Sequence, residues 1–275
     1  MKNRLIVLPL LMAFILTAAA CGGGGGSAEK SGGADHSAAA KAPAKTETAP
    51  AAQTAAPAAG GGMTAVVKGS VKFAGTAPKF EKIKMDADPV CKGLHTAPIM
   101  PEEVVVNANG TLQWVMVYVK DGLGGKTFPV PAAPVVLDQK GCTYHPHIFG
   151  MMAGQGLKIL NSDATLHNIH PLPKVNKGFN VGMPKPGEIM KNFEMAEDPF
   201  HIKCDVHKWM SSYCGVFTHP FFSVTNESGA FELKGLPAGT YTVVAWHEKY
   251  GAKEMSVTVG DGESKDVEFS FAEGA

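Results

Sequence analysis

The sequence has no excess of charge of either sign and no second long apolar run after the one at its N-terminus. Its 275 residues include 25 Lys and Arg and 25 Asp and Glu, so the formal net charge is zero. A nucleic-acid-binding protein needs an excess of cations to meet the phosphates, which argues against that class here. A single long apolar run also excludes a polytopic membrane protein. The content of 45% apolar and 18% charged residues is typical of a globular domain.

The N-terminus has the pattern of an export signal followed by a lipid anchor. Lys2 and Arg4 precede an apolar run over residues 5–16, which is too short to span a bilayer comfortably. Ala18-Ala19-Ala20 then leads into Cys21, and this resembles a bacterial lipobox, whose cysteine carries diacylglycerol. The lipobox more often has leucine at the position of Ala18, so plain secretion after an Ala-x-Ala site is the alternative. We predict a signal peptide over residues 1–20, lipidation of Cys21, and a place in the bacterial cell envelope, facing the periplasm or at the surface.

Residues 21–63 form a predicted flexible linker. Between Gly22 and Gly62 there is no Val, Ile, Leu, Phe, Tyr or Trp, and most residues are Ala, Gly, Pro, Ser or Thr. Such a composition cannot bury enough apolar surface to order itself. The sequence therefore predicts a membrane-tethered protein whose folded part begins near residue 64.

From residue 64 onward the pattern is that of an all-β protein. Short segments rich in β-branched and aromatic residues alternate with turn signals such as Asn109-Gly110 and Asp261-Gly262, and no segment has a convincing amphipathic helical period. The predicted strands cover residues 65–73, 80–85, 104–106, 112–119, 135–137, 157–160, 190–195, 200–203, 213–218, 231–233, 241–246, 254–259 and 267–271. We predict one β-rich region over residues 64–220 and a smaller β-sandwich over residues 221–275.

The tail carries the pattern of a known small domain. Residues 226–233 and the turn Leu236-Pro237-Ala238-Gly239-Thr240-Tyr241 resemble carboxypeptidase regulatory-like domains, which are small transthyretin-like β-sandwiches. Ordinary hairpin chemistry, in which Pro and Gly mark turns, is the alternative. Those domains usually open with a Gly-x-Val strand, and Gly69-Ser70-Val71 fits it. This leaves open a nested arrangement, with the middle region inserted into the tail sandwich, beside a tandem one.

A cluster of potential metal ligands is the most informative part of the sequence. Cys204, His207 and Met210 form a Cys-x2-His-x2-Met loop between two apolar segments, and a His167-Asn168 pair precedes it. One thiolate, two imidazoles and a thioether are a soft donor set that suits copper cycling between Cu(I) and Cu(II). Zinc is disfavoured because its protein ligands are thiolate, imidazole and carboxylate.

The same residues resemble the cupredoxins of the amicyanin and plastocyanin type over roughly residues 134–218, and the short loop resembles that of the amicyanins in particular. The resemblance implies a Greek-key β-sandwich with one type 1 copper, bound by His167, Cys204, His207 and Met210. It further implies that Asn168 ties the two ligand loops together and that His207 is a partly exposed edge through which electrons leave. Val206 and Lys208 stand where amicyanin-like loops have prolines, which puts the nature of the docking surface in doubt.

Structural explanations exist for these residues taken singly. Cys204 alone reads as a buried thiol, His207 as a surface residue and Met210 as core filling, but their joint occurrence in ligand order favours copper. The pair His145 and His147 is a candidate for a second metal. We interpret these two as hydrogen-bonded packing residues instead, together with the other histidines outside the ligand set, His95, His170, His201, His219 and His247. Met151-Met152 reads as core filling.

The remaining cysteines allow one disulfide. Without Cys21 four are left, and four cysteines allow three full pairings. If Cys204 binds copper, three remain, and the exported location permits a bond between two of them. We favour Cys91 with Cys142, because both lie in turn-rich segments outside the ligand loop, and read Cys214 as a small buried residue.

The leading hypothesis is a membrane-tethered blue copper protein that carries single electrons between a donor and an acceptor protein. We predict no enzymatic activity, because no nucleophile–base pair or pair of catalytic carboxylates is recognisable. The main alternative is a periplasmic copper-binding or copper-delivery protein, which the Met and His content motivates. A third reading is an adhesion or scaffold module built on the tail sandwich.

Overall fold

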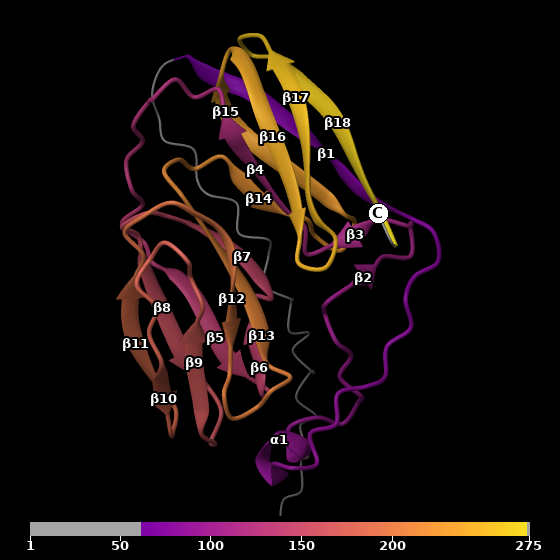
Figure 1. Cartoon of the computed structure of the whole chain (residues 1–275), viewed down its shortest axis with the longest axis vertical. Helices are drawn as coiled ribbons and strands as arrows, with labels where there is room; N and C mark the ends of the chain where they lie inside the picture. The colour runs from indigo at the N-terminus through magenta and orange to yellow at the C-terminus, as the bar shows by residue number, and fades with distance from the viewer. Residues whose placement is uncertain (1–61, 274–275) are drawn as a thin grey trace, which may run out of the picture. The chain divides into compact units, whose positions relative to one another are not determined.

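A computed structural model of the protein describes residues 62–273 (Figure 1). The predicted signal peptide, Cys21 and the linker up to residue 61 lie outside these residues. The described part contains 18 strands and a single five-residue helix, so the prediction of an all-β fold is confirmed. Within residues 62–273, no helix is both long enough and apolar enough to cross a membrane.

Strands from both ends of the described chain build one β-sandwich, which we term the tail sandwich. Its sheets have the strand orders β15-β1-β18 and β14-β4-β16-β17, and their buried faces share one apolar core. Figure 1 shows the indigo β1 beside the yellow β18, although they lie far apart in the sequence. The strands of the tail sandwich are β1 (Met63–Ala74), β4 (Met116–Asp121), β14 (Phe222–Val224), β15 (Ala230–Pro237), β16 (Gly239–His247), β17 (Gly251–Val259) and β18 (Ser264–Ala272).

A second sandwich, the inserted sandwich, lies in the chain between β4 and β14. Its sheets have the orders β10-β9-β12-β13-β7 and β11-β8-β5-β6 around a separate apolar core. The chain order is therefore nested, because strands of the tail sandwich precede and follow it. The strands of the inserted sandwich are β5 (Val135–Lys140), β6 (Thr143–His145), β7 (Ile148–Met152), β8 (Gly156–Asn161), β9 (His167–Pro171), β10 (Val181–Met183), β11 (Gly187–Asn192), β12 (Glu197–Lys203) and β13 (Ser211–Phe217).

The Gly-x-Val pattern of β1 has a steric reason. β1 is the central strand of its sheet, antiparallel to β15 and parallel to β18. A Cβ atom on Gly69 would lie 1.7 Å from the carbonyl oxygen of Val267 in β18. Only glycine fits at this position, while Val71 two residues later is fully buried in the tail core.

Two predicted strands differ from the structure. Residues 80–85 are not a strand but part of a long connection after β1. The predicted strand over residues 112–119 is divided into β3 (Leu112–Gln113), which pairs with β2 (Val105–Val106), and β4. Trp114 between them has a φ of 62°, and its N–H donates to the Thr225 carbonyl. The left-handed backbone at this point ends the extended run, which the apolar pattern alone does not reveal.

The connection between β1 and β2 contains the helix, and we call residues 75–104 the cap segment. The helix α1 (Pro89–Gly93) begins after Asp88, whose side chain accepts hydrogen bonds from the N–H groups of Val90 and Cys91. An aspartate at the N-cap with proline at the first helical position is a strong helix start. A disulfide joins Cys91 in α1 to Cys142 between β5 and β6, so the cap segment is covalently bound to the inserted sandwich.

The two sandwiches belong to one compact unit of the chain and share a small apolar cluster. Met116 and Phe222 from the tail sandwich pack there with Ile148 and Met152 from β7. Beside it, the buried side chains of His147 and Glu248 form an ion pair. The predicted role of the Met151-Met152 pair as core filling is confirmed, because both residues are buried.

Buried histidines make the stability of the fold depend on pH. His219 lies between the rings of Phe217 and Phe221, and its Nδ1 accepts a hydrogen bond from the Phe221 N–H. Burial lowers the pKa of His219 from 6.5 to about 4. Between these values the unfolded chain binds a proton that the folded chain does not, so stability falls as the pH falls from 6.5 towards 4.

We therefore expect His219→Gln to weaken the pH dependence of unfolding. From pH 7 to pH 5, the unfolding free energy of the wild type should fall by about 2 kcal/mol more than that of the variant. Urea unfolding at each pH measures both changes. His145→Gln is the control, because His145 is exposed. Equal pH slopes in the wild type and His219→Gln would contradict the assignment.

Candidate metal centre

The strand order of the inserted sandwich brings the two predicted ligand segments to the same end of one sheet. β12 pairs antiparallel with β9, with Lys203 opposite His170. The loop that follows β12 begins at Cys204 and ends at Met210, directly before β13, and His167 is the first residue of β9. The loop therefore meets the start of β9.

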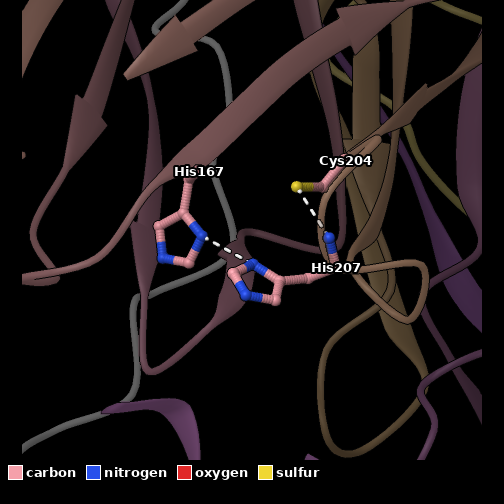
Figure 2. Close-up of side chains that lie close together, drawn as sticks. All are labelled: His167, Cys204 and His207. Atoms are coloured by element: carbon pink, nitrogen blue, oxygen red, sulfur yellow. Dashed lines mark hydrogen bonds between the residues drawn. The ribbon is translucent and has the colours of Figure 1, made fainter. Parts of the chain in front are cut away.

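Three of the predicted ligands converge on one buried point (Figure 2). The Nδ1 atoms of His167 and His207 face each other at 3.1 Å, and the His207 N–H donates to Cys204 Sγ at 3.3 Å. One donor atom from each of these residues lies within 4.8 Å of the other two. His167 and Cys204 are fully buried, and His207 is 3% exposed. Two imidazoles and a thiol thus share a site that excludes water.

Backbone hydrogen bonds fix the shape of the ligand loop. The Met210 N–H donates to the His207 carbonyl at 3.0 Å, and the Cys204 N–H donates to the Met210 carbonyl at 3.3 Å. Met210 is buried and belongs to the same apolar cluster as Cys204. The Asn168 side chain accepts from the N–H of Asp205 at 2.9 Å, so Asn168 ties the start of β9 to the loop, as the family resemblance implies.

The polar surroundings shift the protonation of the two fully buried donors. Burial alone would raise the pKa of Cys204, but hydrogen bonds from His167 and from backbone N–H groups outweigh it and lower that pKa. Burial alone would lower the pKa of His167, but Asp163 and Cys204 outweigh it and raise that pKa to about 9. Both shifts favour the charged forms of these two groups, and metal binding would release the protons that they carry.

The expectation that His207 forms an exposed edge is wrong. Its Nε2 lies 3.0 Å from a carboxylate oxygen of Asp88 and 3.5 Å from the Cys91 Sγ. Its ring also packs against Trp209, with ring centroids 5.0 Å apart. The physical reason is the cap segment, which brings Asp88 and Cys91 over the edge that the family resemblance leaves open.

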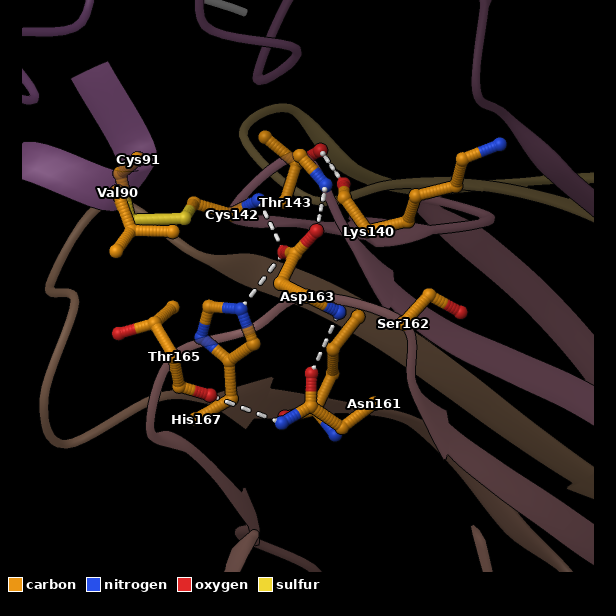
Figure 3. A network of polar contacts seen from close by, with 12 residues as sticks. Val90, Cys91, Lys140, Cys142, Thr143, Asn161, Ser162, Asp163, Thr165 and His167 are labelled. Carbon is orange, nitrogen blue, oxygen red and sulfur yellow. Dashed lines mark hydrogen bonds and ion pairs between the residues drawn. A yellow bond between two sulfur atoms is a disulfide. The ribbon is translucent and has the colours of Figure 1, made fainter. Parts of the chain in front are cut away.

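Sequence reasoning missed two residues of this site, Asp163 and Asp88. Asp163 lies 2.8 Å from His167 Nε2 and also accepts from the N–H groups of Gly141 and Cys142 (Figure 3). Asp88 could have been noticed as a helix N-cap from its Asp-Pro sequence, but its contact with His207 joins residues 119 positions apart. No local pattern reports such a contact.

The other cysteines and histidines agree with their predicted roles. The predicted disulfide between Cys91 and Cys142 is present, and Cys214 is free and buried. In the described part of the chain, no potential metal-binding group of three includes a histidine other than His167 and His207. The remaining histidines of residues 62–273 instead make hydrogen bonds or ring contacts. They are His95, His145, His147, His170, His201, His219 and His247.

The chemistry of the donor set fits copper. Two imidazole Nδ1 atoms and a thiol with a lowered pKa converge at a buried point, and such nitrogen and sulfur donors favour copper over hard oxygen-binding cations. Each of the two imidazoles has a carboxylate at the nitrogen that faces away from the other imidazole, and metal-binding histidines usually have such an outer partner.

Comparisons with known proteins bear on the two sandwiches separately. Residues 219–272 match the family model of the carboxypeptidase regulatory-like domain. This match confirms the resemblance to that domain that the sequence of the tail predicts. None of the curated proteins matches the chain.

Among solved structures, a novel purple cupredoxin from Nitrosopumilus maritimus is 18% identical, with a TM-score of 0.26. The match covers 30% of this chain and 98% of the cupredoxin. A mutant amicyanin in the Cu(I) state is also 18% identical, with a TM-score of 0.28, and the match covers 36% of this chain and 97% of amicyanin. A copper-containing nitrite reductase from Thermus scotoductus is 15% identical with a TM-score of 0.29. That match covers 34% of this chain and 25% of the reductase, so the chain spans about a quarter of its length.

Proposed function

We propose that this protein is an exported, membrane-tethered carrier of single electrons with one type 1 copper in the inserted sandwich. His167, Cys204 and His207 would hold the copper, with the thioether of Met210 as a fourth ligand. The observation that carries the proposal is the convergence of two imidazole Nδ1 atoms and a thiol in a buried loop. When bound, copper supplies a one-electron Cu(I)/Cu(II) couple.

The residues of this chain would support electron transfer by keeping the ligands in place. The backbone bonds of the ligand loop and the Asn168 link hold Cys204 and His207 against β9. The site also excludes water, because each of its three converging residues is at most 3% exposed. Ligands that do not move between oxidation states lower the reorganisation that electron transfer requires. The tether would be the lipid on Cys21 with the linker behind it, and the partners would be a donor and an acceptor redox protein.

The experiment that tests the proposal is a visible and paramagnetic-resonance spectrum of the copper-loaded full chain in detergent. We expect an intense thiolate-to-Cu(II) absorption that disappears on reduction and returns on oxidation. A colourless protein that holds only Cu(I) would instead indicate copper delivery, and failure to bind copper would favour the scaffold hypothesis. Lipidation is checked separately, since Cys21→Ser should release the protein from the membrane fraction.

A further inference from the structure

Both imidazoles of the candidate centre face a carboxylate at the nitrogen that points away from the other imidazole. His167 Nε2 lies 2.8 Å from Asp163 Oδ2, and His207 Nε2 lies 3.0 Å from Asp88 Oδ2. Asp163 comes from the inserted sandwich itself, just after β8, whereas Asp88 comes from the cap segment. The centre is therefore completed by a residue from outside the sandwich that carries the other ligands.

The backbone N–H groups of the two disulfide-bonded cysteines, Cys91 and Cys142, hold the carboxylates of Asp88 and Asp163 in place. The Cys142 N–H donates to Asp163 Oδ2 at 2.7 Å, as Figure 3 shows. The Cys91 N–H donates to Asp88 Oδ1 at 3.2 Å. Each half of the disulfide thus holds the aspartate that contacts one of the two imidazoles.

Asp88 uses its two oxygens for two different tasks. Oδ1 caps α1 by accepting from Val90 and Cys91, which is all that a helix N-cap requires. Oδ2 instead accepts from the Thr165 hydroxyl at 3.0 Å and faces His207. The side chain of Asp88 is 19% exposed and that of His207 is 4% exposed, so water screens this contact weakly.

We propose that Asp88 is a positioning residue for His207, held in place by the disulfide, and that its charge lowers the reduction potential of the centre. This rests on the proposed function. A carboxylate that accepts from Nε2–H leaves Nδ1 free as a ligand and makes the imidazole a stronger donor. A nearby negative charge also favours the more positive oxidation state, which is Cu(II).

The test compares Asp88→Asn with Asp86→Asn in the copper-loaded full chain. Asparagine keeps an oxygen for the helix cap but removes the charge. Asp86 is the matched control because it is two residues away, 71% exposed in its side chain, and paired with Lys92 rather than with His207. We expect Asp88→Asn to shift the Cu(I)/Cu(II) equilibrium at least tenfold towards Cu(I), a rise of about 59 mV for one electron. Asp86→Asn should shift it less than threefold, and equal shifts in both variants would overturn the proposal.

A second measurement does not depend on metal or on how the variants fold. Nitrogen-15 spectra of the imidazoles in the copper-free wild type should show His207 with its proton on Nε2. A His207 proton on Nδ1 alone would overturn the proposal, because Asp88 would then not hold the ring. A wild type that binds no copper would overturn both the proposed function and the role of Asp88. A copper-loaded Asp88→Asn variant with an unchanged reduction potential would overturn only the role of Asp88.

Discussion

Cys204→Ser is expected to abolish the thiolate-to-Cu(II) absorption of the copper-loaded protein completely. The band arises from charge transfer between the sulfur and the metal, and Cys204 provides the only thiol in the group that contains both His167 and His207. The loss of an outer partner alone costs about 10–100-fold in metal affinity, so the loss of a direct ligand should lower the affinity for copper by more than about 100-fold. Both effects can be measured by visible spectroscopy and by competition with a copper chelator.

Cys214→Ser is the matched control for this substitution. Cys214 is also free and fully buried, but it lies in β13 and belongs to none of the potential metal-binding groups in residues 62–273. Cys214→Ser should therefore keep the absorption band and the copper affinity, even if it loses some stability. An intense band in Cys204→Ser, or its loss in Cys214→Ser with the fold intact, would contradict the assignment of the thiolate ligand.

Removal of the disulfide by the double substitution Cys91→Ser and Cys142→Ser should lower the free energy of unfolding by about 4 kcal/mol. The two cysteines are 51 residues apart in the sequence, and a cross-link that closes a loop of this length restricts the unfolded chain considerably. The folded protein should also lose order locally, because the cap segment would be attached to the inserted sandwich only by non-covalent contacts such as the packing of Met85 and Ile83 near Trp209.

Urea unfolding measures this effect, with the oxidised and the reduced wild type beside the double variant. The reduced wild type should resemble the variant, and a reducing agent should leave the stability of the variant unchanged. A loss of less than about 1 kcal/mol would contradict the prediction, because the loop-closure contribution expected from the disulfide is much larger.

The ligand loop was predictable from the sequence because its donors are close in the chain. Cys204, His207 and Met210 lie within seven residues on one turn, and the structure brings two of them to His167. The Asn168 link was predictable for a similar reason, since this residue directly follows a ligand. The β-strand pattern predicted the five strands of the inserted sandwich that correspond to β5, β8, β11, β12 and β13, whereas it predicted none at β6, β7, β9 or β10.

The cap segment could not be predicted in this way. Residues 80–85 resemble a strand in composition but form no ladder. Ile83 and Met85 pack beside the disulfide, whereas Phe80 packs against the core of the tail sandwich. Their position depends on the bond to Cys142 and on the contact of Asp88 with His207. Both join points far apart in the chain, so tertiary contacts override the local pattern.

The nested chain order has a consequence for engineering. β4 and β14, which flank the inserted sandwich in the sequence, are antiparallel neighbours with Tyr118 opposite Phe222. The inserted sandwich therefore begins and ends in the chain at two adjacent strands of the tail sandwich. A short turn between Asp121 and Phe222 should close the tail sandwich without the inserted sandwich. The inserted sandwich by itself would lack Asp88 and Cys91, because both belong to the cap segment, which precedes β4 in the chain.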